Sequence, residues 1–413
     1  MKSRALRSIL LIILLVLPLI FSRDSQVGVM NACGIMIILA LSYNVLLGQA
    51  GLLSFGHAIY FGLPAFAAIH IMNAAAAARL PLPLPVIPLA SGLAGLLLAV
   101  LLGSISTKRG GVTFAMITLG LGELIHASAP VLPSFFGGED GIRADRTALL
   151  PVLGFRFGSS VQMYYLICFW AVIMVVMLYF FRKSPTGRLL EAIRENPQRI
   201  EFLGFSTQRL RYVAVLASGL AAGVAGGLAA ANYEIVSYAS LGSVQSGNAL
   251  LMVCLGGSKL FWGPILGAVI VTILQTFLSD YTQAWMLYFG LLFMFVVLYM
   301  PSGISWWLTS HWQVMKSGSW KRLLGPYIRI SLPVLAFVAS AIVVIEMLQS
   351  QLTKSGGGAG HPSLLGFGSG LPSTSAWLLS ISICFASLLL VRRFWADVRA
   401  AWAAANDTGM KAV

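Results

Sequence analysis

The sequence predicts an all-α protein, a polytopic bundle of transmembrane helices. Of its 413 residues, 58% are hydrophobic and only 10% are charged, whereas a soluble domain carries roughly 25% charged residues. The apolar runs continue over about 20 residues, the length that spans a bilayer as a helix. They lack the period-2 alternation that is typical of a transmembrane β-strand. Because lipid offers the backbone no hydrogen-bonding partner, the helical bundle is the fold class that remains.

Hydropathy predicts about ten core spans followed by two extra C-terminal spans. We expect them near residues 6–22, 28–47, 56–73, 85–106, 112–131, 161–181, 212–231, 244–255, 262–279, 284–300, 328–348 and 375–391. Residues 1–22 resemble a cleaved signal peptide in part, but Phe21-Ser22-Arg23-Asp24 offers no small-x-small cleavage motif, so we expect a retained span. The span at 244–255 is too short to cross alone. It either lines a cavity at mid-membrane, or its boundary is misplaced by one turn.

The net charge of +14 follows the membrane topology. If the N-terminus is cytoplasmic, only six of the 27 Lys and Arg residues fall in outer connections. Such an excess of basic residues on the inner side is the positive-inside pattern, so we expect both termini in the cytoplasm and no nucleic-acid partner. The four cysteines are scattered, one in each of four apolar runs, which favours packing roles over a metal site or a disulfide framework.

Three hydrophilic segments interrupt the pattern: an outer loop at 132–160, an inner loop at 182–211, and an inner linker at 301–327. We therefore expect a core at 1–305, with 182–211 as its main cytoplasmic loop, and a C-terminal extension at 306–413. The extension contains two spans and, from Arg392 to about Ala405, aromatic and basic residues at helical spacing. That pattern predicts an interfacial amphipathic helix. Small residues at Gly219, Gly223 and Gly227 predict a helix-packing seam in the core.

The inner loop predicts two short amphipathic helices. From Gly187 it reads GRLLEAIRENPQRIEFLGF, with apolar residues at near-helical intervals: Leu189, Leu190, Ile193, Ile200 and Leu203. Asn196 is the expected cap of the second helix, with Pro197 in its first turn. The pattern fits either a loop that lies against the lipid or a docking element for a cytosolic partner.

The chain carries no motif for catalysis. It contains no Walker A, HExxH or GxSxG sequence, and Gly256-Gly257-Ser258-Lys259 lacks the spacing of a phosphate-binding loop. Any ATPase must therefore be another chain, unless an ion gradient drives transport. Ionisable residues at membrane depth are candidates for an ion-coupled carrier, namely His57, Glu123, His126 and Glu346. We expect Glu123 to face the bundle interior or a water-filled path; a structural hydrogen bond between helices is the alternative.

Six further blocks, in order along residues 28–305, resemble one known family. They are NVLLGQAGLLSFGHA from Asn44, GVTFAMITL from Gly111, GGEDGI from Gly137, SGNALLM from Ser246, WGPILGA from Trp262 and YMPSG from Tyr299. Together with the inner loop they are similar to permeases of the branched-chain amino-acid ABC transporter family, in particular the LivM-type permease. Two features depart from it: Ser258-Lys259-Leu260 replaces a small, glycine-containing turn, and the two extra spans have no counterpart.

The resemblance implies a bacterial inner-membrane permease subunit of an ATP-driven importer, which is not itself an enzyme. Expected partners are a second homologous permease, two cytosolic ATPases that bind the ATP, and a periplasmic solute-binding protein. The chain itself would hold no cofactor, metal or catalytic residue. The segment 187–204 would be the coupling element, with Gly187, Arg188, Glu191, Ala192, Arg194, Glu195 and Gly204 as its functional residues. The expected translocation path includes Ser54, His57, Thr118 and Glu123.

Three alternatives stay open. The solute is by default a branched-chain amino acid, but another amino acid, an amide, urea or a small organic acid also fits the resemblance. A secondary carrier would use Glu123 and Glu346 to bind the coupling ion. A scaffold protein would use the extra spans to recruit a partner.

Overall fold

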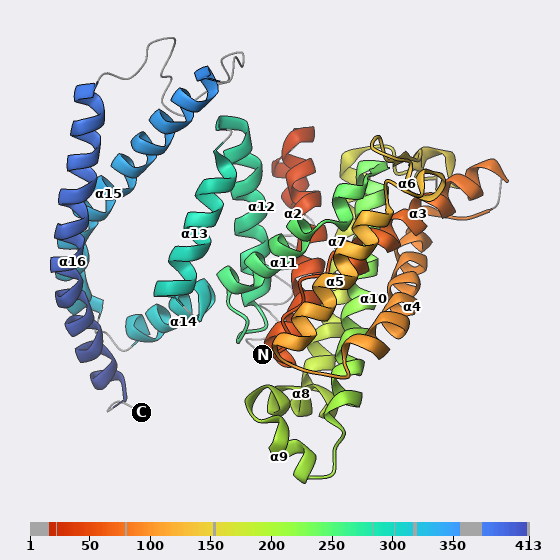
Figure 1. Cartoon of the computed structure of the whole chain (residues 1–413), viewed down its shortest axis with the longest axis horizontal. Helices are drawn as coiled ribbons and strands as arrows, with labels where there is room; N and C mark the ends of the chain where they lie inside the picture. Colours follow the sequence, from red (N-terminus) through yellow and green to blue (C-terminus); the bar gives the residue numbers. More distant parts are fainter. Residues whose placement is uncertain are drawn as a thin grey trace. The chain divides into compact units, whose positions relative to one another are not determined.

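The computed structural model describes residues 16–21, 23–78, 81–151, 154–282, 284–300, 302–316, 320–355 and 374–410. These residues are almost entirely helical, which confirms the all-α class (Figure 1). They divide into two compact units. The first covers the chain to Ile273 and a short segment that ends at Ile304; the second covers Leu274–Met300 and Ser305 onward. The functional boundary at 305 stays a prediction.

The first unit holds the helices from α2 to the first part of α12. Their bounds are α2 (Asp24–Asn44), the π-helix η1 (Val45–Gln49), α3 (Ile59–Ala77), η2 (Leu84–Val86), α4 (Ile87–Ser106), α5 (Val112–Ser128), α6 (Pro133–Phe136), η3 (Arg146–Ala148), α7 (Ser160–Lys183), α8 (Pro185–Glu195), α9 (Pro197–Phe202), α10 (Thr207–Tyr233), η4 (Tyr238–Leu241), α11 (Ser243–Gly256) and α12 (Gly263–Tyr281). Two short strands, β1 (Ile142–Arg143) and β2 (Ile235–Val236), pair antiparallel.

Helix α10 lies at the centre of this unit, packed against α2, α3 and α4. Its glycines allow the close approach: an ideal Cβ on Gly223 would lie 2.5 Å from the carbonyl oxygen of Ser91 and 3.1 Å from the Cα of Gly95. Helices in lipid associate through such small-residue faces, because lipid tails provide no hydrophobic drive between them. The predicted packing seam on α10 is confirmed.

Eight described helices are long and apolar enough to span a membrane. They are Asp24–Gln49, Ile59–Ala77, Leu84–Ser106, Ser160–Lys183, Thr207–Tyr233, Gly263–Tyr281, Leu323–Gln349 and Trp377–Trp402. Each coincides with an expected span. The span expected at 6–22 lies mostly outside the described residues.

Three expected spans form helices that are too short to span a membrane by themselves. The segments at 112–131, 244–255 and 284–300 form α5, α11 and α13 (Trp285–Tyr299), of 17, 14 and 15 residues. At a rise of 1.5 Å per residue, α11 is only about 21 Å long, against about 30 Å of hydrocarbon. The length of α11 therefore favours a short element that does not cross the membrane alone, and not a misplaced boundary of the expected span at 244–255. Helix α13 reaches the required length only together with α14 (Gly303–Lys316), from which it is bent by 53°.

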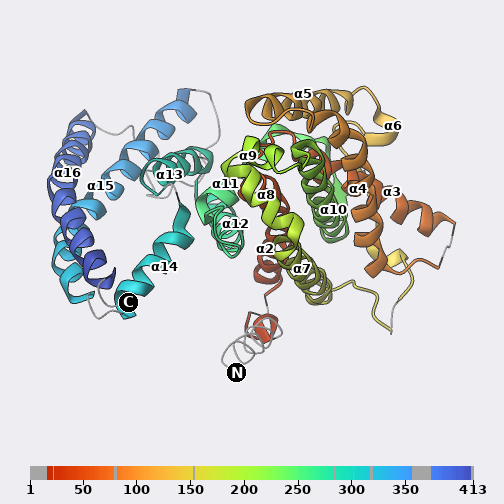
Figure 2. The same cartoon turned by 90° about the horizontal axis from the view of Figure 1, so that it is seen from below.

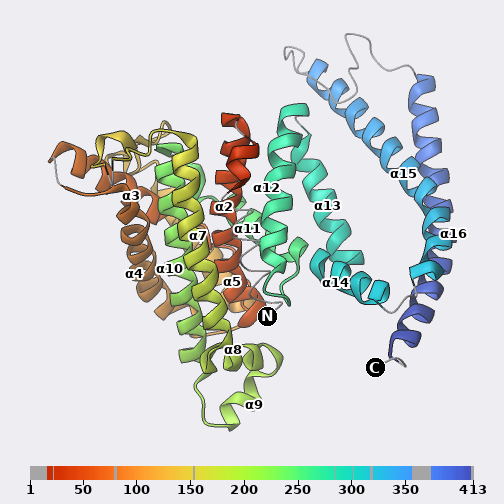
Figure 3. The same ribbon diagram turned by 180° about the vertical axis from the view of Figure 1, so that it is seen from behind.

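The second unit corrects two expectations. The linker predicted at 301–327 is helical over α14 and over the start of α15 (Trp320–Ser355). Helix α16 (Thr374–Met410) runs without a break past Arg392, so no separate interfacial helix follows its span (Figure 3). The reason is local: 374–408 contains neither proline nor glycine, and arginine is a good helix former. Helices α15 and α16 pack side by side (Figure 1).

We expect Gly223→Leu to destabilise the protein, because the added side chain has no space between α10 and α4. Overpacking of this kind costs about 1–3 kcal/mol, so the thermal unfolding midpoint in detergent should fall. The control is Gly290→Leu on α13, where an ideal Cβ meets no atom within 4 Å. An equal fall in both variants would contradict the role given to Gly223.

Candidate functional site

The predicted pair of short helices is present as α8 and α9. Ser184 caps α8 by accepting a hydrogen bond from the backbone N–H of Gly187 (3.2 Å). Asn196 caps α9 in the same way, accepting from the N–H of Arg199 (3.1 Å), with Pro197 in the first turn. The pair projects from one end of α7 and α10 (Figures 1 and 3). Gly187 lies where α7 turns into α8, and a Cβ there would collide with two carbonyl oxygens of the preceding turn.

An apolar tip forms the far end of this pair. Phe202 is 90% exposed, Leu203 65% and Phe205 46%. Between them, Gly204 has a φ of +85°, a left-handed conformation that reverses the chain and that glycine adopts without strain. Leu203 was expected to continue the helical apolar pattern of Leu190 and Ile193, which are buried. It is exposed instead, because α9 ends at Phe202 and the helical period stops there.

The charged residues of α8 divide into two groups. Arg188, Arg194 and Glu195 are exposed, and Glu191 is half-buried. Glu191 and Arg194 nevertheless contact the rest of the unit: Glu191 pairs with Arg182 of α7 (2.8 Å), and Arg194 donates a hydrogen bond to the carbonyl oxygen of Gly48. The helix thus has one face bound to the rest of the protein, while the other face and the apolar tip are uncovered.

Three of the four predicted path residues lie together in the interior. Ser54, His57 and Thr118 are all buried. The hydroxyl of Tyr43 donates to the carbonyl oxygen of Ser54 (2.9 Å), and His57 Nε2 lies 2.9 Å from Ser42 Oγ. Ser54 and His57 come close to Thr118 because the segment that carries them crosses α5 at Gly56. A Cβ on Gly56 would collide with the Thr118 carbonyl oxygen.

Glu123 does not face the interior of this chain, so the first of its two expected positions is wrong; that it borders a water-filled path stays a prediction. It lies on the exposed side of α5, near Met116 and Leu124, which are 69% and 66% exposed. Helix α5 runs along the edge of the first unit (Figure 2). It packs through the close contact of Gly122 with Gly56, and through His126, whose ring lies 5.7 Å from that of Tyr238. Among the described residues, the remaining face of α5 is left uncovered.

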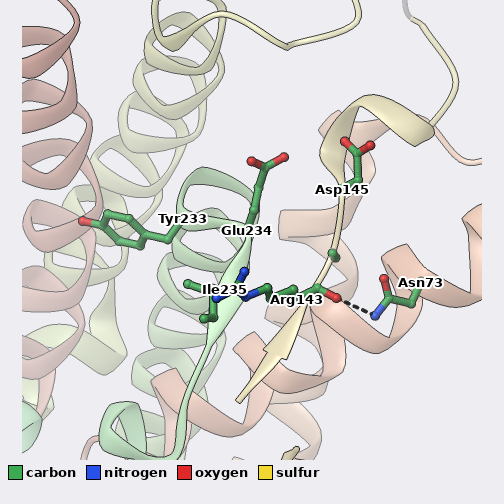
Figure 4. A pocket seen from close by; sticks show the side chains of 7 residues that line it. Asn73, Arg143, Asp145, Tyr233, Glu234 and Ile235 are labelled. Carbon is green, nitrogen blue, oxygen red and sulfur yellow. Dashed lines mark hydrogen bonds between the residues drawn. The ribbon is translucent and has the colours of Figure 1, made fainter. Parts of the chain in front are cut away.

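The opposite end of the unit carries a polar cavity of about 520 Å³ beside the β1–β2 ribbon. Seven residues line it: Asn73, Arg143, Ala144, Asp145, Tyr233, Glu234 and Ile235. Asn73 Nδ2 donates to the carbonyl oxygen of Arg143 (3.0 Å), as Figure 4 shows. The Thr147 hydroxyl and N–H both donate to Asp145, which holds the pKa of that carboxyl below its ordinary value.

Arg146 fixes the ribbon to the end of α10. Its guanidinium donates to the carbonyl oxygens of Asn232 (3.0 Å) and Gly158 (3.0 Å), and its backbone N–H donates to Glu234 (3.0 Å). A cation at the C-terminus of a helix satisfies carbonyl groups that the helix leaves unpaired.

Comparison with known proteins identifies the family of this chain. The family described as "Branched-chain amino acid transport system / permease component" matches residues 25–300. The chain belongs to this family. It is therefore a multi-pass inner-membrane permease of the ABC transporter class, and not an enzyme, as the sequence blocks indicated.

Individual relatives agree with this assignment. The permease is 28% identical to the high-affinity branched-chain amino acid transport permease LivM of Salmonella typhimurium, over 73% of this chain and 75% of that protein. It is 27% identical to LivM of Escherichia coli over the same shares. It is also 27% identical to the guanosine ABC transporter permease NupQ of Bacillus subtilis, over 33% of this chain and 45% of that protein. No solved structure matches the permease.

The family match ends at residue 300, so α14, α15 and α16 of the permease lie beyond it. Within the described residues of the second unit, two hydrogen bonds join the extension to the end of the matched region. Thr282 donates to Gln349 (3.1 Å), and Tyr288 of α13 donates to Glu346 (3.1 Å). Glu346 is thus a buried acceptor between helices, whose role in ion binding stays a prediction.

We expect a thiol at the apolar tip to react much faster than one on the inner face of α8. In a variant whose four native cysteines are replaced by serine, Phe202→Cys should react with a maleimide at least about tenfold faster than Leu190→Cys, because Leu190 is fully buried. The measurement is the labelling rate of the purified permease in detergent. Similar rates at the two positions would contradict the exposure of the tip.

Proposed function

We propose that this permease is a translocation subunit of an ATP-driven importer for branched-chain or related amino acids. The observation that carries the proposal is the uncovered apolar tip at the end of a charged two-helix loop. A cluster of exposed apolar side chains typically marks a protein or membrane interaction site, and we propose a protein partner for this one. A separate cytosolic ATPase would bury Phe202 and Phe205, and the cycle of ATP binding and hydrolysis would move α8 and α9.

The charge distribution supports the orientation that this mechanism needs. Seven basic residues lie in 182–211, between α7 and the first turn of α10. By the positive-inside rule the loop is cytoplasmic. The ATP would then be bound by two ATPase subunits, and this chain would need no cofactor or metal of its own. Nucleic acid is not a partner in this account, because the basic residues are explained by topology.

The uncovered face of α5 supports a second, homologous permease as a partner. A carboxylate such as Glu123 is costly in lipid unless it faces protein or water. We propose that the second permease covers this face, so that Glu123 borders a solute path between the two subunits. At the other end, the cavity beside Arg143 would receive the periplasmic solute-binding protein, which delivers the solute.

The solute is proposed from the family, with branched-chain amino acids as the first candidate. The similarity to a guanosine permease indicates that related proteins carry other solutes. The family also favours ATP over an ion gradient as the driving force, and Glu123 and Glu346 belong to different compact units. Uptake of radiolabelled leucine by the reconstituted complex, dependent on ATP and on the binding protein, tests the proposal directly. Uptake by the permease without an ATPase, driven by a pH or sodium gradient, would overturn it.

We expect Phe202→Asp and Gly204→Asp to weaken the binding of the ATPase subunits. A buried aromatic side chain at the centre of an interface contributes at least about 2 kcal/mol, so the affinity should fall by tenfold or more. Co-purification of the ATPases with the tagged permease measures this loss. The matched control is Gln208→Asp, an exposed position in the first turn of α10. Full retention of the ATPases by both tip variants would refute the docking assignment.

We expect Glu123→Gln to reduce leucine uptake about tenfold. An ionisable side chain at membrane depth is costly, and such residues usually belong to the transport path. Assembly with the ATPases should be unaffected, since Glu123 lies away from α8 and α9. Asp24→Asn, at the exposed start of α2, is the control. If uptake by Glu123→Gln equals that of the wild type, Glu123 has no role in the path.

A further inference from the structure

We infer that Arg194 is a positioning residue, which ties α8 to the π-helix η1 and transmits the movement of α8 to the buried polar residues around His57. The inference rests on the proposed function, because it takes an ATPase to move α8 and α9. It adds a division of labour within the coupling element: the apolar tip binds the ATPase, whereas Arg194 conveys its motion into the membrane.

The contact of Arg194 with the end of η1 and with the turn that follows it has two parts. The Nη1 group donates a hydrogen bond to the carbonyl oxygen of Gly48. The aliphatic part of the same side chain lies against Gly51, where an ideal Cβ would come within 2.7 Å of Arg194 Cγ. Gly51 also has a φ of +66°, which favours glycine. The turn is therefore shaped to receive the Arg194 side chain.

A second connection fixes α8 to the turn between α11 and α12. Arg182 bridges the two elements: its Nε pairs with Glu191 of α8 (2.8 Å), and its Nη2 donates to the carbonyl oxygen of Lys259 (2.9 Å). The neighbouring carbonyl oxygen of Ser258 would lie 2.6 Å from a Cβ on Gly48. Helix α8, the end of η1 and the Ser258–Lys259 turn thus meet at one point.

The element that receives Arg194 is suited to rearrangement. A π-helix is rare and is frequently found at functional sites. At its two ends, the side-chain oxygens Asn44 Oδ1 and Gln49 Oε1 are buried and accept no hydrogen bond from the described residues. Buried acceptors of this kind are costly. A different winding of η1 that satisfied them would therefore offset part of the cost of a conformational change.

From η1 the contacts lead to the predicted path. Ser42 and Tyr43, on the last turn of α2, bind His57 and the Ser54 carbonyl oxygen respectively, each at 2.9 Å. Ser218 of the central helix α10 donates to the Ser42 carbonyl oxygen (2.8 Å) and so provides a fixed point. A displacement of Gly48 would move the last turn of α2 relative to α10, and Ser54 and His57 would move with it.

The test uses the assembled transporter, with both permeases, the ATPases and the binding protein, in proteoliposomes. The variant is Arg194→Ala, the conservative variant is Arg194→Lys, and the control is Arg209→Ala at an exposed arginine of α10. We expect Arg194→Ala to retain its ATPases and its ATP hydrolysis, while leucine uptake per ATP falls about tenfold. Arg194→Lys keeps a donor for the Gly48 carbonyl oxygen and should recover most of the leucine uptake per ATP hydrolysed.

A second readout does not depend on the solute. A bimane fluorophore on Leu47→Cys, in the transporter whose native cysteines are serine, reports the surroundings of η1. Its emission should shift when ATP and vanadate are added, and Arg194→Ala should abolish the shift. If Arg194→Ala does not accumulate in the membrane, Arg194→Gln is measured in its place.

The outcomes separate the two claims. An unchanged uptake ratio and an unchanged bimane shift in Arg194→Ala, with the ATPases bound, would overturn the inference and leave the proposed function standing. Loss of the ATPases from Arg194→Ala would also overturn it, because Arg194 would then belong to the docking surface. If the permease takes up leucine without an ATPase, the proposed function itself fails.

Discussion

The attachment of α8 to the membrane-embedded turns is the constraint on which the rest of this structure depends. A loop that a partner protein pushes transmits this force only if it is attached both to the partner and to the rest of its own chain. Here the inner end is fixed by the bond from Arg194 to Gly48 and by the Glu191–Arg182 pair. The outer end is an apolar tip shaped by Gly204. The charged residues of α8 thus serve two different purposes, according to the face on which they lie.

Glycine allows the chain to form these connections inside a bilayer. Gly48 and Gly51 let α8 and the Ser258–Lys259 turn approach η1, Gly56 lets the following segment cross α5, and Gly223 brings α10 against α4. Since lipid does not drive helices together, close backbone approach supplies the packing. The same glycines therefore hold the bundle together and bring the coupling element near the predicted path.

The sequence predicted those helices whose formation depends on residues close together in the chain. Asn196 and Pro197 predicted α9 because capping and proline geometry act over a few residues, and hydropathy predicted the long spans because a span is one continuous segment. The exposed Leu203 was missed because the helical period was carried beyond the helix end. The contact of Arg194 with Gly48 joins residues 146 apart, so no local pattern indicates it. The exposure of Glu123 depends on which neighbours cover α5, and the sequence of one chain does not contain them.

The most direct measurement of the central claim is a pair of cryo-electron microscopy structures of the assembled transporter, without nucleotide and with ATP trapped. The account predicts that the apolar tip is buried in the ATPase in both states. It also predicts that α8, η1 and the Ser258–Lys259 turn move together relative to α10, with the bond from Arg194 to Gly48 intact. An α8 that moves while η1 stays fixed against α10, or an ATPase that contacts the permease elsewhere, would contradict it.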